Sequence, residues 1–220
     1  MFQKIFSLKS FLKILWIIIC LLWNCGAGEQ NHDNQADRII NSEIKPVLYM
    51  GSRLLYLVEV AENVKYNLEV EFTSIEPELT FNFLMNNMDF TFGSVQVSPI
   101  GLSEGSTLMS HFEDGNTNLP NDCTALILSE KNYSDIILDR KTTLSINKKP
   151  QEEFFLQEND YLKFELDSIT YSALCFHLAT KNNSHQIWVM KNNRLPILIK
   201  LISETEPKLT LLEWKTPSRI

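Results

Sequence analysis

The chain has 220 residues, of which 44% are hydrophobic, and it carries 20 Lys and Arg against 27 Asp and Glu, a net charge of −7. A chain of this length can bury one substantial core. An acidic chain lacks the basic surface through which proteins bind nucleic acid or anionic lipid headgroups. Composition therefore favours a single folded domain and excludes nucleic acid as a partner.

Residues 1–24 have the pattern of an export signal. Lys4, Lys9 and Lys13 precede ten unbroken apolar residues, which run from Ile14 to Trp23. A helix needs about 20 apolar residues to cross the hydrocarbon core, whereas the apolar region of a signal peptide has about 7–15. The pattern predicts a signal peptide over residues 1–24.

The residues that follow resemble a lipid attachment site. Leu-Leu-Trp-Asn-Cys-Gly at 21–26 is similar to the relaxed lipoboxes of spirochaetal lipoproteins, in which Asn is tolerated before the cysteine. The resemblance implies cleavage before Cys25 and attachment of a fatty acid such as palmitate, which would anchor the protein to a membrane of the bacterial cell envelope, most simply the outer membrane. The alternatives are an uncleaved membrane anchor and ordinary cleavage near 26–28, which would give a secreted protein. Cys20 is the weaker attachment site, because the isoleucines before it include no small residue.

Removal of residues 1–24 would take away 3 of the 20 basic residues, leaving 17 Lys and Arg against 27 Asp and Glu, a net charge of −10. Residues 25–46 are rich in Asn, Gln and Gly and are predicted to form a flexible, lipid-anchored tether. Residues 47–220 are predicted to form one β-rich domain.

The clearest strand pattern covers residues 64–73, where apolar and polar side chains alternate. Such alternation is typical of a strand with one buried face. The apolar run at 54–60, which precedes it by three residues, is expected to pair with it as an antiparallel hairpin. Further strands are predicted at 79–85, 90–97, 123–128, 142–147, 162–166, 169–178, 187–190, 196–201 and 209–214.

Two helices are expected between these strands. Ser98 can cap a helix whose first residue is Pro99, with apolar residues as far as Phe112 and a stop at 113–115. Ser129 can cap a second helix that runs to Asp139. These elements predict a mainly β fold, an antiparallel sandwich or a strongly curved sheet with one or two short helices.

Two segments resemble an uncharacterised family of exported bacterial lipoproteins, residues 81–99 and residues 187–201, whose Asn-rich turn is followed by Leu-Pro. This family implies no assigned activity and no functional residues. The second segment is also similar to hairpins of lipoprotein carriers built on a curved sheet. That likeness implies an alternative function, the carriage of a small hydrophobic ligand.

No cofactor or metal motif is present in the sequence. The four histidines, His32, His111, His177 and His185, have no zinc-ligand spacing. Cys175 and His177 would share one face of a strand, but that face reads as core. We therefore predict no bound cofactor and no metal, and we do not expect an enzyme, with a hydrolase as the less favoured alternative.

Three residues of the 79–85 strand, Phe81, Phe83 and Met85, point to one face and are predicted to be either core or ligand-facing. Cys123 and Cys175 are a candidate disulfide, with two buried free thiols as the alternative. The leading hypothesis is a membrane-anchored binding or envelope-structural module, whose partner would be a protein or a small hydrophobic ligand.

Overall fold

The structure is a computed structural model that describes residues 46–61, 63–87 and 89–217. The predicted signal peptide, Cys25 and nearly all of the predicted tether lie outside these residues. In the described part of the chain, neither helix is long and apolar enough to span a membrane.

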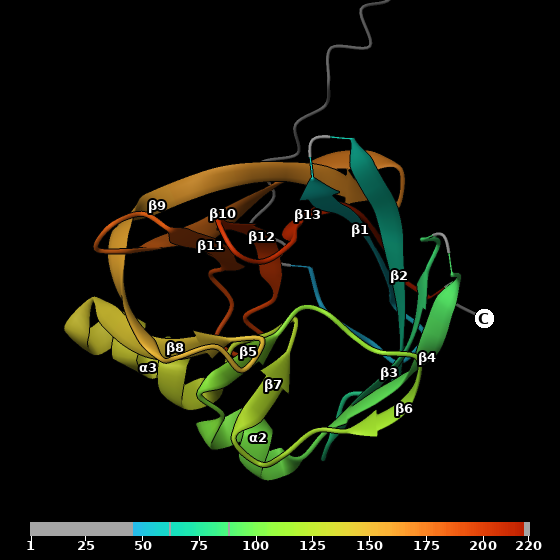
Figure 1. Ribbon diagram of the computed structural model, residues 1–220, viewed down its shortest axis with the longest axis horizontal. Coiled ribbons are helices and arrows are strands. Elements are labelled where there is room, and N and C mark those ends of the chain that lie inside the picture. The colour runs from blue at the N-terminus through green and yellow to red at the C-terminus, as the bar shows by residue number, and fades with distance from the viewer. Residues whose placement is uncertain (1–45, 62, 88, 218–220) are drawn as a thin grey trace, which may run out of the picture. The chain divides into compact units, whose positions relative to one another are not determined.

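The described residues form thirteen strands and two helices (Figure 1). The first half contains β1 (Arg53–Ala61), β2 (Val64–Ser74), β3 (Leu79–Met85), β4 (Thr91–Val97), α2 (Pro99–Glu104), β5 (Thr107–Met109), β6 (Gly115–Asn118) and β7 (Cys123–Ala125). The second half contains α3 (Glu130–Asp139), β8 (Lys141–Ile146), β9 (Glu152–Leu166), β10 (Ile169–Thr180), β11 (His185–Met190), β12 (Leu198–Ser203) and β13 (Lys208–Lys215).

All thirteen strands belong to one sheet with the order β6-β4-β3-β2-β1-β13-β12-β11-β10-β9-β8-β5-β7. Most neighbours are antiparallel. In addition, β13 pairs in parallel with the end of β9, through Glu213 with Glu165 and Trp214 with Leu166. The sheet therefore curls until strands β9 to β13 close into a five-stranded ring, and the predicted mainly β fold class is confirmed.

The hairpin predicted from alternation is present as β1 and β2. Leu54 pairs with Val70 and Tyr56 with Leu68, and these four side chains are buried at 1% exposure or less. Glu69, between two buried residues of β2, is exposed. Because side chains alternate across a strand, the polar residues of β2 face outward while its apolar residues reach the core.

The first helix is shorter than its sequence predicts. Ser98 caps it as expected, since its hydroxyl oxygen accepts a hydrogen bond from Gly101 N at 3.1 Å, but α2 ends at Glu104 and residues 107–109 form β5 instead of a helix. A Cβ atom on Gly101 would lie 2.4 Å from the carbonyl oxygen of Cys123. The glycine is thus explained by close packing of the helix on β7, and the expectation of a helix as far as Phe112 was wrong.

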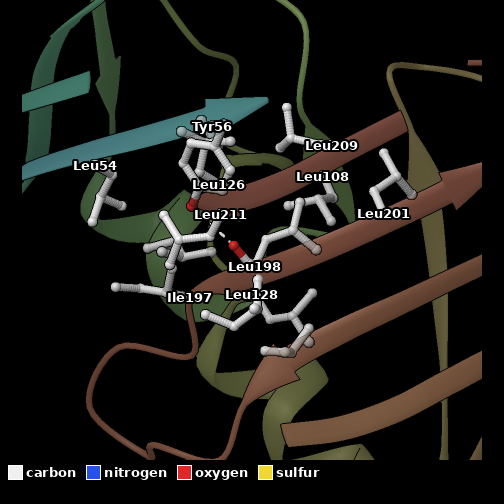
Figure 2. Packing of buried hydrophobic residues seen from close by; sticks show 14 of the residues in the cluster. Leu54, Tyr56, Leu108, Leu126, Leu128, Ile197, Leu198, Leu201, Leu209 and Leu211 are labelled. Atoms are coloured by element: carbon white, nitrogen blue, oxygen red, sulfur yellow. Dashed lines mark hydrogen bonds between the residues drawn. The ribbon is translucent and has the colours of Figure 1, made fainter. Parts of the chain in front are cut away.

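The centre of the core contains one buried polar link, which Figure 2 shows among leucine side chains. The hydroxyl of Tyr56 donates a hydrogen bond to the carbonyl oxygen of Leu198 at 2.9 Å, and burial raises the pKa of this tyrosine. The N–H group of Leu198 in turn donates to the carbonyl of Leu126 at 2.8 Å. The segment after β7 is therefore fixed against β12, and β12 against β1.

Candidate functional site

The three residues predicted to be core or ligand-facing lie in the core. Phe81, Phe83 and Met85 are at most 3% exposed. The ring of Phe112 lies 5.5 Å from that of Phe81 and 5.3 Å from that of Phe83, and Phe72 lies 5.6 Å from Phe81. These edge-on and tilted contacts are the packing that aromatic rings prefer. The inner face of β3 is therefore filled by aromatic side chains.

The candidate disulfide is not formed, because Cys123 and Cys175 are both free and buried. They lie on β7 and β10, which three other strands separate in the sheet. Burial raises the pKa of the Cys175 thiol to about 12 and also raises that of Cys123. Both side chains are therefore neutral thiols near pH 7, the form that neither attacks substrates nor binds metals.

The three histidines that the structure describes, His111, His177 and His185, do not form a metal centre. His177 stacks on Trp188 with ring centres 4.2 Å apart, and its Nε2 lies 3.1 Å from Gln186 Oε1. His111 is exposed, and His32 lies outside the described residues. Among the residues that the structure describes, no group of three or more His, Cys, Asp or Glu could hold a metal ion.

One surface depression is a groove of about 1340 Å³, called the apolar groove below. Its lining comes from five segments: Val47, Leu48 and Tyr49; Ile75, Glu76 and Pro77; Pro99, Leu102 and Ser103; Ile127, Leu128 and Glu130; and Asn192, Asn193, Arg194, Leu195 and Pro196. Most of these residues are apolar. The amides and charged side chains come from two connections, β2–β3 and β11–β12, and from the first residue of α3.

The first described residues of the chain lie at this groove. The base of the groove is formed by buried side chains that are 2% exposed, those of Leu48, Ile127 and Leu128. Val47 and Tyr49, by contrast, are 46% and 49% exposed. The side-chain amide of Asn192 donates to the carbonyl of Pro46 at 3.5 Å, which holds residues 46–49 against the connection between β11 and β12. The apolar groove therefore begins where the predicted tether ends.

A second depression, of about 630 Å³, has a polar lining and is called the polar pocket below. It is lined by Glu59, Val60, Asn183, Ser184, Ile202, Ser203, Glu204, Thr205, Glu206, Pro207 and Lys208. Beside it lies His185, whose Nδ1 is 2.8 Å from Glu152 Oε2 and whose Nε2 is 3.3 Å from Thr205 Oγ1. The imidazole thus bridges a carboxylate and the hydroxyl of a pocket residue.

Neither depression is apparent from the sequence. His185 was noted only as one of four histidines, and Glu152 and Thr205 were not singled out. They are separated from His185 by 33 and 20 residues in sequence, so no local motif joins them. The alternation of apolar and polar residues along the strands could indicate that all three residues lie near strand ends. It could not show that these strand ends meet.

Comparison with known proteins gives no relative for this chain. No protein-family model matches it, and neither do curated proteins or solved structures. The resemblance of residues 81–99 and 187–201 to exported lipoproteins therefore stays a prediction.

Proposed function

We propose that this protein is a membrane-anchored extracytoplasmic lipoprotein that binds an extended, predominantly apolar segment of a partner protein in the apolar groove. The observation that supports the binding role is the size of the apolar groove. Small-molecule sites usually measure about 300–1,000 Å³, and this groove of about 1340 Å³ is larger. A ligand longer than a typical small molecule is therefore the better match.

The lining also favours a protein segment over an acyl chain. Apolar side chains form the base, while Glu76, Arg194 and the amides of Asn192 and Asn193 supply charges and hydrogen-bonding groups beside it. A peptide has polar backbone groups along its whole length, which must find partners when its apolar side chains are buried. An acyl chain would leave these polar groups of the groove without partners.

The predicted lipid would keep the groove close to the membrane. A flexible tether of about 21 residues between Cys25 and Pro46 has a root-mean-square span of roughly 25 Å. A partner at the same membrane surface would then meet the groove at a raised effective concentration. This is why we favour a partner that is itself in the cell envelope.

The first test concerns the anchor. When a bacterium that processes lipoproteins expresses the protein with radiolabelled palmitate, the wild type is expected to be labelled and Cys25→Ala to lose essentially all label. Cys20→Ala is the matched control and should keep it, because Cys20 lies within the segment that is removed. Equal labelling of Cys25→Ala and wild type would contradict lipidation at Cys25.

The second test concerns the apolar groove. Reduced, carboxymethylated α-lactalbumin, a permanently unfolded chain, is expected to bind the purified full chain saturably. The double variant Val47→Ser/Tyr49→Ser should weaken this binding about tenfold, since a loss of roughly 1.4 kcal/mol of apolar contact corresponds to that factor. Isothermal titration calorimetry measures both affinities.

The control for this test is Val64→Ser/Tyr161→Ser. It removes the same two residue types at sites that are 52% and 62% exposed and outside the groove. It should bind like the wild type. Equal weakening by both double variants would show that the probe binds exposed apolar side chains at large. A fluorescent fatty acid that binds saturably where the unfolded chain does not would replace this proposal with the carrier alternative.

A further inference from the structure

The side chain of His185 has its hydrogen-bonding roles fixed by its neighbours. A carboxylate only accepts hydrogen bonds, so the contact of 2.8 Å to Glu152 Oε2 requires a proton on Nδ1. In the neutral imidazole Nε2 is then the acceptor, and the hydroxyl of Thr205, 3.3 Å away, donates to it. Hydroxyl, imidazole and carboxylate therefore stand in the order that activates a nucleophile in hydrolases.

Packing holds the imidazole in this position. His185 is 9% exposed, and its backbone N–H donates to Thr180 Oγ1 at 3.1 Å. The hydroxyl of Ser184 lies 3.1 Å from Nδ1 and donates a hydrogen bond to Asn182 Oδ1 at 2.8 Å. Its oxygen can therefore accept a second, bifurcated hydrogen bond from Nδ1–H. Both partners on the Nδ1 side thus favour the tautomer in which Nε2 faces Thr205.

The hydroxyl of this arrangement is open to a ligand. Thr205 is exposed and lines the polar pocket, whose volume of about 630 Å³ lies within the usual range of roughly 300–1,000 Å³ for small-molecule sites. Ser203 and Lys208 line the same pocket and offer hydrogen bonds and a positive charge. The pocket therefore suits a small, polar substrate.

We propose that the polar pocket hydrolyses small, polar carboxylic esters, with Thr205 as nucleophile, His185 as general base and Glu152 as the residue that positions His185. The Oγ1 atom of Thr205 would attack the ester carbonyl while its proton passes to His185 Nε2. The C–O bond to the alcohol then breaks, and the alcohol leaves with that proton. A water molecule, deprotonated by His185, attacks the acyl-threonine, which releases the carboxylic acid and restores the Thr205 hydroxyl.

Donors for the negative charge of the tetrahedral intermediate are also present. The backbone N–H groups of Thr205 and Glu206 both point at Ser203 Oγ, at 3.1 and 3.0 Å. They belong to the nucleophile and to the residue after it, where oxyanion-binding N–H groups commonly lie. Rotation of the Ser203 hydroxyl would make both available to the oxyanion.

This inference does not depend on the proposed binding role, because the polar pocket and the apolar groove share no residue. Its test uses the purified full chain and p-nitrophenyl acetate. Thr205→Ala and His185→Gln are expected to lower kcat/KM at least about 100-fold, Glu152→Gln at least about tenfold, and Thr205→Ser should retain activity. Circular dichroism melting curves establish that each variant is folded.

Surface imidazoles also cleave this ester slowly, so His111→Gln is the matched control. His111 is exposed and outside the pocket, and this variant should keep the wild-type rate. A second measurement needs no variant: a biotinylated fluorophosphonate should label the wild-type chain at Thr205, as located by mass spectrometry. Turnover that Thr205→Ala leaves unchanged, labelling at other residues only, or neither turnover nor labelling would each overturn the proposal.

Discussion

Phe81→Ala is expected to lower the free energy of unfolding by about 3–5 kcal/mol, because it removes a buried ring that packs against two other aromatic rings. Phe81 is 0% exposed and lies between Phe72 and Phe112, with ring centres 5.6 and 5.5 Å away. Its cross-strand neighbours Phe72 and Val95 are buried as well. The strands on both sides are fixed by the sheet, so they cannot move in to close the cavity.

Urea unfolding of the full chain, followed by circular dichroism, measures this loss. Phe92→Ala is the control, since Phe92 is 62% exposed on the neighbouring strand β4 and should change stability by no more than about 0.5 kcal/mol. The same variants also test the carrier alternative. If Phe81→Ala left the stability unchanged but altered the binding of a fluorescent fatty acid, the inner face of β3 would be a ligand surface instead of core.

The elements that sequence predicted well are those in which one face is buried along the whole strand. In β3 the buried residues are Leu79, Phe81, Phe83 and Met85, which follow the two-residue period without a break. The hydrophobic pattern of such a strand also sets its register, since a slip by one residue would turn every apolar side chain outward. Local alternation was therefore sufficient there.

Where the period is interrupted, sequence reasoning failed. The first half of β9, residues 152–160, was not recognised as a strand, and its register with β10 shifts between His177 and Leu178, which pair with Glu158 and Leu156. Gln157 is thus an extra residue, and a bulge of this kind moves the following side chains to the opposite face. The β9 strand therefore shows no continuous alternation.

The candidate sites could not be predicted, because both depend on contacts between distant segments. The apolar groove combines residues 47–49 with residues 192–196, and the bridge from Glu152 through His185 to Thr205 joins the starts of β9 and β11 to the connection between β12 and β13. Strand patterns say which face a residue occupies, but they do not say which strand ends lie together. Which strand ends lie together is determined by the way the sheet closes into a ring.

Trp214 stabilises the pairing of β13 with β9 that closes the ring. Trp214→Ala is therefore expected to lower the free energy of unfolding by about 3–5 kcal/mol. Its side chain is 0% exposed, its ring stacks on Phe164 of β9 at 6.2 Å, and it pairs with Leu166 where β13 meets β9. Its carbonyl oxygen also accepts a hydrogen bond from Asp167 N at 3.0 Å. Truncation would therefore remove the packing that joins the two strands which close the ring.

Trp214→Phe should behave differently, because the indole Nε1 is buried and has no hydrogen-bond partner among the described residues. Leaving such a donor unsatisfied costs about 1–3 kcal/mol, which phenylalanine avoids while it keeps a ring against Phe164. This gain offsets most of the stability lost with the smaller side chain, so the free energy of unfolding of Trp214→Phe should lie within about 1 kcal/mol of the wild-type value. Urea unfolding of both variants measures the difference. A loss with Trp214→Phe as large as with Trp214→Ala would mean that the indole N–H is paired in solution and that the closure depends on it.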